Sequence, residues 1–74
     1  MLRRKESREK ETRGRILATL SANKEGLTIS DVSRILGIHY TTASKYLAVL
    51  EAENKLVHRD ISMAKVFKLK EVEA

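Results

Sequence analysis

The 74-residue chain contains no cysteine, which excludes a disulfide framework and a thiolate metal site. Long apolar runs are also missing, since the longest, Leu47 to Leu50, is far shorter than the roughly 20 residues that a membrane-spanning helix needs. The N-terminal residues Met-Leu-Arg-Arg-Lys are not followed by the apolar region of a secretory signal. We therefore expect a cytoplasmic protein that makes no membrane contact.

The sequence also lacks clusters of metal-ligating or catalytic side chains. His39 and His58 are the only histidines, and neither has a His, Asp or Glu three or four residues away. A protein metal site needs three or four converging ligands, so we predict no metal and no other cofactor. Ser44, His58 and Asp60 are residue types of a catalytic triad, but no pattern brings them together. The chain is therefore not expected to be an enzyme.

The basic charge of the chain is concentrated near its N-terminus. The net charge is +5, and residues 1–15 hold seven basic side chains against three acidic ones, whereas residues 16–74 hold eight against seven. We divide the chain into residues 1–13, a basic arm or helix extension, residues 14–70, a single folded domain, and residues 71–74, a tail. The arm is either a solvated segment or a contact to phosphates or a minor groove. The residues for such a contact are Arg3, Arg4, Lys5 and Arg8.

Residues 30–54 have the pattern of two helices joined by a tight turn. Val32, Ile35 and Leu36 form one apolar stripe, Ser30 is a suitable N-cap, and Gly37 ends the first helix. The second helix is predicted from residue 39 or 40 to residue 53, with Asn54 as a left-handed cap. Its buried stripe is Ala43, Leu47 and Leu50. A helix, a glycine turn and a helix with a polar start indicate a helix-turn-helix.

The flanking segments add one helix and three strands. Residues 14–23 form an amphipathic helix that buries Ile16, Leu17 and Leu20, and residues 27–29 form a strand of three residues at most. Residues 56–60 and 65–69 are predicted strands of a hairpin whose loop, residues 61–64, lacks Gly, Asn and Asp, so its turn type is not predicted. The predicted fold is mainly α with a small β-hairpin (α+β), in the order helix-strand-helix-helix-strand-strand.

Three stretches resemble the winged helix-turn-helix superfamily of small bacterial and archaeal transcription regulators. Residues 27–32, LTISDV, resemble the strand-to-helix entry of these domains, and residues 36–50 resemble their Leu-Gly-Ile turn and recognition helix. Residues 50–57, LEAENKLV, resemble the passage from that helix to the wing. The resemblance covers residues 16–69 and implies a nucleoid-associated protein that binds double-stranded DNA to regulate transcription.

The resemblance also implies roles for individual residues. Tyr40, Thr41, Ser44 and Lys45 match the recognition-helix positions that face the major groove, and Thr42 and Tyr46 flank that face. Hydroxyls and lysine are suited to base edges and phosphates. Arg59 and Lys65 match strand positions that border the wing. The sequence departs from the family pattern at His39, where Ser or Thr is usual, and at the wing tip, which has no basic residue.

Two questions about partners stay open at this stage. The family often dimerises, and here the first helix with the N-terminal arm is the expected surface for a homodimer; Val49 and Met63 are either scattered surface apolar residues or part of such a contact. No small-molecule effector site is visible. Because residues 16–74 are almost neutral, the alternative is a winged-helix module that binds other proteins in a larger assembly and makes no DNA contact.

Overall fold

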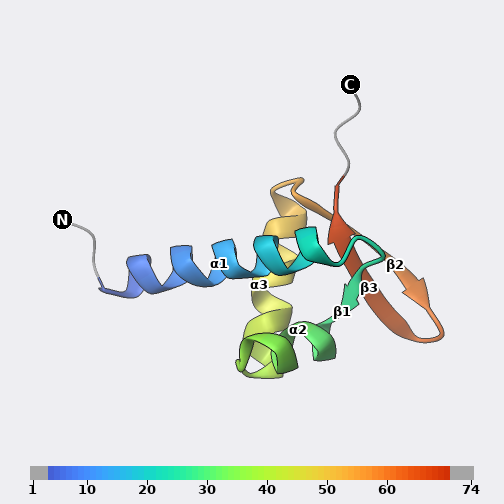
Figure 1. The fold of residues 1–74 in the computed structure, drawn as a ribbon, viewed down its shortest axis with the longest axis horizontal. Helices are drawn as coiled ribbons and strands as arrows, with labels where there is room; N and C mark the ends of the chain where they lie inside the picture. Colours follow the sequence, from blue (N-terminus) through green and yellow to red (C-terminus); the bar gives the residue numbers. More distant parts are fainter. Residues whose placement is uncertain (1–3, 71–74) are drawn as a thin grey trace.

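The computed structural model describes the backbone of residues 4–70 and the side chains of residues 8–70 (Figure 1). Its elements are α1 (Arg4–Ala22), β1 (Leu27–Thr28), α2 (Ile29–Leu36), α3 (Tyr40–Ala52), β2 (Leu56–Ile61) and β3 (Ala64–Leu69). This order confirms the predicted α+β arrangement. No helix within the described residues is long and apolar enough to cross a membrane.

The three strands form one antiparallel sheet with β3 in the centre. Phe67 on β3 lies opposite Leu27 on β1 and opposite His58 on β2. The hairpin of β2 and β3, which we call the wing, is closed by Ser62 and Met63 between the paired residues Ile61 and Ala64. Both turn residues have positive φ (48° and 69°), as in a type I′ turn. Glycine or asparagine usually fills such positions, so this turn could not be predicted from its residue types.

One apolar core joins all three helices to the sheet. Its fully buried members are Ile16, Leu20, Val32, Ala43, Leu47, Leu50, Leu56 and Phe67. The predicted stripes of α1 and α3 are confirmed, with Leu17 packed against the core. The stripe of α2 was wrong at Ile35, whose surface is 49% exposed. Ile29, Val32 and Leu36 attach α2 to the core, while Ile35 lies on the solvent side of the helix.

Helix α2 begins two residues earlier than a Ser30 cap would allow. Thr28 is the N-cap: its hydroxyl accepts the backbone N–H of Asp31 at 3.1 Å, and the Asp31 carboxylate accepts the backbone N–H of Thr28 at 3.1 Å. This reciprocal capping box satisfies two N–H groups that the first turn otherwise leaves free. The prediction of Ser30 as the cap was therefore wrong. Gly37 ends α2 in the left-handed conformation, as predicted (φ 68°).

Helix α1 continues without a break across the predicted boundary at residue 13. Its 19 residues correspond to a rod of about 28 Å, and Figure 1 shows its N-terminal half extending beyond α2 and α3. Arg13 forms an ion pair with Glu53, just after α3, and Glu53 also lies 3.7 Å from the Lys55 Nζ. These contacts attach the middle of α1 to the end of α3.

Candidate nucleic-acid interface

Helix α3 buries one face and exposes polar residues near its start. Ala43, Leu47 and Leu50 are buried on one face, while Tyr40 is 54% exposed and Thr41 and Lys45 are exposed on the other. Thr42 and Ser44 are half-buried between the two faces. Of the side chains predicted to read DNA from this helix, Tyr40, Thr41 and Lys45 are therefore the exposed ones.

The turn before α3 fixes the direction in which that polar side points. The backbone N–H of Ile38 donates to the Ser33 carbonyl at 3.1 Å, and the Ser33 hydroxyl donates to the Ile38 carbonyl at 2.6 Å. Gly37 supplies the positive φ that lets the chain reverse there. Helix α3 is thus held against α2 by the turn as well as by the core.

The start of α3 and the wing line one groove. Its volume is about 390 Å³, and its lining residues are Thr28, Ile29, Ser30, Tyr40, Met63, Ala64 and Lys65. The groove brings Tyr40 from the predicted recognition helix together with Lys65 from the predicted wing. Thr28, Ile29 and Ser30, at the start of α2, were not among the predicted site residues. The Thr-x-x-Asp capping signature of residues 28–31 is the sequence signal that could have located the start of α2 at these residues.

Arg59 and Lys65 lie on opposite faces of the wing. Arg59 is paired with Val66 and Lys65 with Asp60, and successive residues of a strand point to alternate sides. Lys65 therefore shares the groove with Tyr40, whereas Arg59 lines a second hollow with Val57 and Lys68. Lys65 and Arg59 border the wing as predicted, but the structure does not bring them together.

Comparison with protein families agrees with this geometry. Residues 14–60 match the model of the IclR helix-turn-helix domain, which is more than half of the chain. The chain belongs to this family. The predicted membership of the winged helix-turn-helix superfamily is thereby confirmed, and the chain is a DNA-binding domain of a transcription regulator. IclR helix-turn-helix domains are regulatory rather than catalytic. A comparison with curated proteins found no match.

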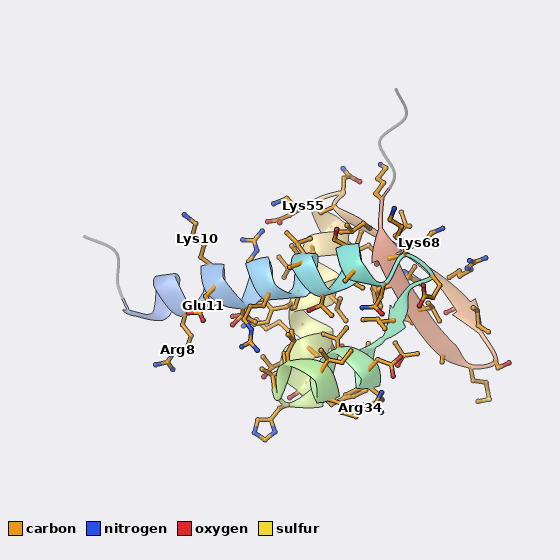
Figure 2. The ribbon with its side chains drawn as sticks, viewed as in Figure 1. Arg8, Lys10, Glu11, Arg34, Lys55 and Lys68 are labelled. Carbon is orange, nitrogen blue, oxygen red and sulfur yellow. The ribbon has the colours of Figure 1, made fainter. Side chains whose placement is uncertain are left out.

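Three carboxylates of this IclR domain contact basic side chains or a histidine, and Asp60 on β2 lies opposite the groove residue Lys65 on β3. Within residues 8–70, Glu53 pairs with Arg13 and Lys55, Glu51 contacts His58, and Asp31 pairs with Arg34 at 2.8 Å. Figure 2 shows Lys55 near the end of α3 and Arg34 near the opposite end of that helix, beside α2. The first turn of α3 contains no acidic residue. Lys45, which lies just beyond this turn, therefore has no acidic residue before it in α3.

The capping interactions of Asp31 hold the start of α2, which lines one end of the groove. The hydrogen bonds from the Thr28 backbone and hydroxyl groups lower the pKa of the Asp31 carboxyl below its usual value, and the nearby Arg34 adds to the effect. Asp31 is therefore ionised at neutral pH, with its charge directed into the capping box and the Arg34 pair. It opposes the approach of a polyanion less than a free carboxylate would.

Other predicted residues lie at or beyond the edge of the interface. Tyr46 is half-buried and packs against the core, so much of its ring is unavailable to a ligand. Arg4 and Lys5 lie in the first turn of α1, and Arg3 falls outside the described residues. Arg8 is exposed, and Figure 2 shows Arg8 and Lys10 on opposite sides of α1. Their contact with DNA stays a prediction, as does the division of the chain at residue 13.

A metal centre does not form among the side chains that the structure describes. No group of three or more His, Cys, Asp or Glu residues lies close enough there to hold an ion. His39 precedes α3 as its N-cap but makes no side-chain capping hydrogen bond, and His58 contacts Glu51.

Proposed function

We propose that this IclR domain binds double-stranded DNA in a sequence-specific manner, with α3 in the major groove and the wing on the flanking backbone or minor groove. The observation that carries the proposal is the shared groove in which Tyr40 faces the same space as Lys65. A duplex seated on α3 would meet the wing without any rearrangement.

The polar side of α3 supplies the chemistry for reading bases. Thr41 and Ser44 carry hydroxyls that donate or accept at base edges, and Lys45 donates to guanine acceptors or to a phosphate. Tyr40 adds a phenol at the mouth of the groove. Thr42, which flanks the face of α3 that carries Thr41 and Lys45, is assigned to the sugar-phosphate backbone. Of this set, Tyr40, Thr41 and Lys45 are the most accessible.

The start of α3 also suits a phosphate without any side chain. The first intrahelical hydrogen bond runs from the Ala43 N–H to the His39 carbonyl at 2.9 Å, so the N–H groups of residues 40–42 precede it. The His39 side chain caps none of them. Free N–H groups and the positive end of the helix dipole together attract an anion. This explains how an uncapped helix start is useful in a DNA-binding protein.

A homodimer would supply the contacts that one domain lacks. A single module makes few base contacts, and two copies on a palindromic site would double them with half-sites about one helical turn apart. The N-terminal half of α1 extends beyond the rest of the domain, which makes it the accessible surface for pairing (Figure 1). We assign the dimer contact to α1, including the arm residues.

Affinity measured as a function of salt concentration tests the proposal. Random duplexes are first selected on the protein, and the selected site is then titrated at several salt concentrations. On duplex DNA the slope of log affinity against log salt is about −0.9 for each phosphate contacted. A selected palindrome with a clear salt dependence supports DNA recognition by a dimer. Failure to bind any duplex at low salt contradicts the proposal.

The alternative is a winged helix that binds protein. The observation in its favour is the small net charge of residues 16–74, eight basic against seven acidic side chains. Such a module would give a salt slope near zero and no enriched sequence in the selection. The same experiment therefore separates the two functions.

A further inference from the structure

The tip of the wing is apolar and fully exposed. Met63 has 104% of its reference surface exposed, and Ile61, at the end of β2, has 48%. Figure 1 shows the β2–β3 turn at the free end of the hairpin, projecting away from the helices. The Met63 side chain therefore adds nothing to the core, and folding alone does not account for a large apolar group at this position.

The backbone of the tip makes methionine a costly choice for folding. Ser62 and Met63 both have positive φ, a conformation that glycine and asparagine adopt more easily than other residues. An Asn-Gly pair would close this two-residue hairpin with less strain. The methionine thus occupies a position where it is exposed and conformationally unfavourable, which indicates a role outside the folded domain.

Met63 also borders the groove assigned to DNA. It shares that groove with Tyr40, at the start of α3, and with Lys65, which lies two residues beyond the tip. In the proposed complex, α3 lies in a major groove and we place the adjacent minor groove at the wing. Lys65 would lie on the phosphates there, and Met63 would be the group that points into the groove.

We propose that Met63 is an apolar wedge that enters the minor groove and partly unstacks one base step, so that the domain bends its DNA. Exposed Met, Leu, Ile and Phe side chains act in this way in proteins that kink DNA from the minor groove. Pyrimidine–purine steps such as TA unstack most easily, so a preference for them at the wing position follows without any hydrogen bond to a base. The inference rests on the proposed function.

The experiment compares Met63 variants on two versions of the selected site. One version carries a TA step at the wing position and the other a stiff A-tract, and fluorophores at the duplex ends report bending by energy transfer. Met63→Leu keeps a wedge of similar size, Met63→Ala removes it, and Met63→Gly removes it while relieving the backbone. Ile35→Ala, at a position 49% exposed on α2, is the control for losing an exposed apolar group elsewhere.

The wedge predicts a distinct pattern across these proteins. Wild type and Met63→Leu bend the TA duplex and prefer it to the A-tract. Met63→Ala and Met63→Gly bind the TA duplex about tenfold more weakly, the order expected when one base-step preference is lost, and they bend it less. The salt slope stays unchanged because no phosphate contact is removed. Met63→Gly is in addition more stable to urea than wild type, so its weaker binding is not a folding defect.

Three results would overturn the inference. If wild type binds with a clear salt slope but Met63→Ala binds, bends and selects identically, the wedge is absent and the proposed function stands. If Met63→Ala changes the oligomeric state and leaves DNA bending intact, the tip is a protein contact. If wild type binds no duplex at all, the proposed function fails and the wedge fails with it.

Discussion

The Nδ1 atom of His58 contacts the Oε2 atom of Glu51 and so joins the wing to the last turns of α3. The His58 ring also lies 5.4 Å from the Phe67 ring, tilted by 43°, above the core. The side chains of His58 and Glu51 are 28% and 33% exposed, respectively. Because one partner is on β2 and the other on α3, this contact helps to fix the angle between the two parts of the proposed DNA interface.

Glu51→Ala, His58→Ala and the double variant should reveal a coupled pair. We expect a coupling energy of about 0.5–1 kcal/mol from urea unfolding of the four proteins, in the range measured for partly exposed ion pairs. Each single variant should also weaken DNA binding, since the wing loses a support. If the effects of the two single variants on the free energy of unfolding are strictly additive, the contact does not help to attach the wing to α3.

Gly26→Ala should destabilise the domain by at least about 2 kcal/mol. A Cβ at Gly26 would lie 2.6 Å from the Val66 Cγ1 atom and 3.0 Å from the Phe67 carbonyl oxygen, and the backbone φ of 101° already disfavours a side chain. Thermal unfolding measures the loss. Gly14→Ala is the matched control, because it meets nothing within 4 Å in the middle of α1 and should stabilise the domain by about 0.5–1 kcal/mol.

Asp31→Asn should lower stability at neutral pH, and the difference from wild type should shrink in acid. The folded-state pKa of Asp31 lies below its usual value of 3.8, so the folded state favours the carboxylate. That contribution is complete above the unfolded pKa and is lost as the pH falls through the folded one. Unfolding free energies of both proteins between pH 7 and pH 2 provide the measurement. A difference that stays constant below pH 3 would argue against the capping role of this carboxylate.

Lys45→Ala distinguishes base reading from backbone contact. If Lys45 donates to a base, the variant should lose about 1–3 kcal/mol on the selected site and much less on random DNA. If it contacts a phosphate, the loss should be equal on both and the salt slope should become shallower by about 0.9. Lys24→Ala, which removes the same charge at a groove near the end of α1, should change neither quantity appreciably.

The fold could be predicted largely because its signals are local. The stripe of Ala43, Leu47 and Leu50, the Gly37 stop and the left-handed Asn54 (φ 64°) are each encoded within a few residues, and all appear in the structure. Two local assignments, the cap at Ser30 and the buried position of Ile35, were wrong. Thr28 offered a better cap because Asp31 lies three residues beyond it, which completes a capping box that Ser30 cannot form.

The interface was less accessible to sequence reasoning because it depends on how distant segments meet. The groove that joins Tyr40 to Lys65 follows from the hairpin register, and that register is set by a turn at Ser62 and Met63 without glycine or asparagine. Knowing the register would also have placed Arg59 on the outer face. The pairing of Arg13 with Glu53 joins residues far apart in the sequence, so no helical spacing could have indicated it.

Because β3 is the central strand, the three-stranded sheet can form only after β3 has been synthesised. Residues that α2 and α3 need for their mutual contacts are synthesised close together, whereas Leu27 on β1 must wait for Phe67 on β3, the last strand of the sheet. Pairing over such a sequence separation is the slow kind of folding step. The pairing of β1 with β3 is thus completed last, and we expect nascent chains to hold a formed helix pair with an incomplete sheet that does not yet compete for operator sites.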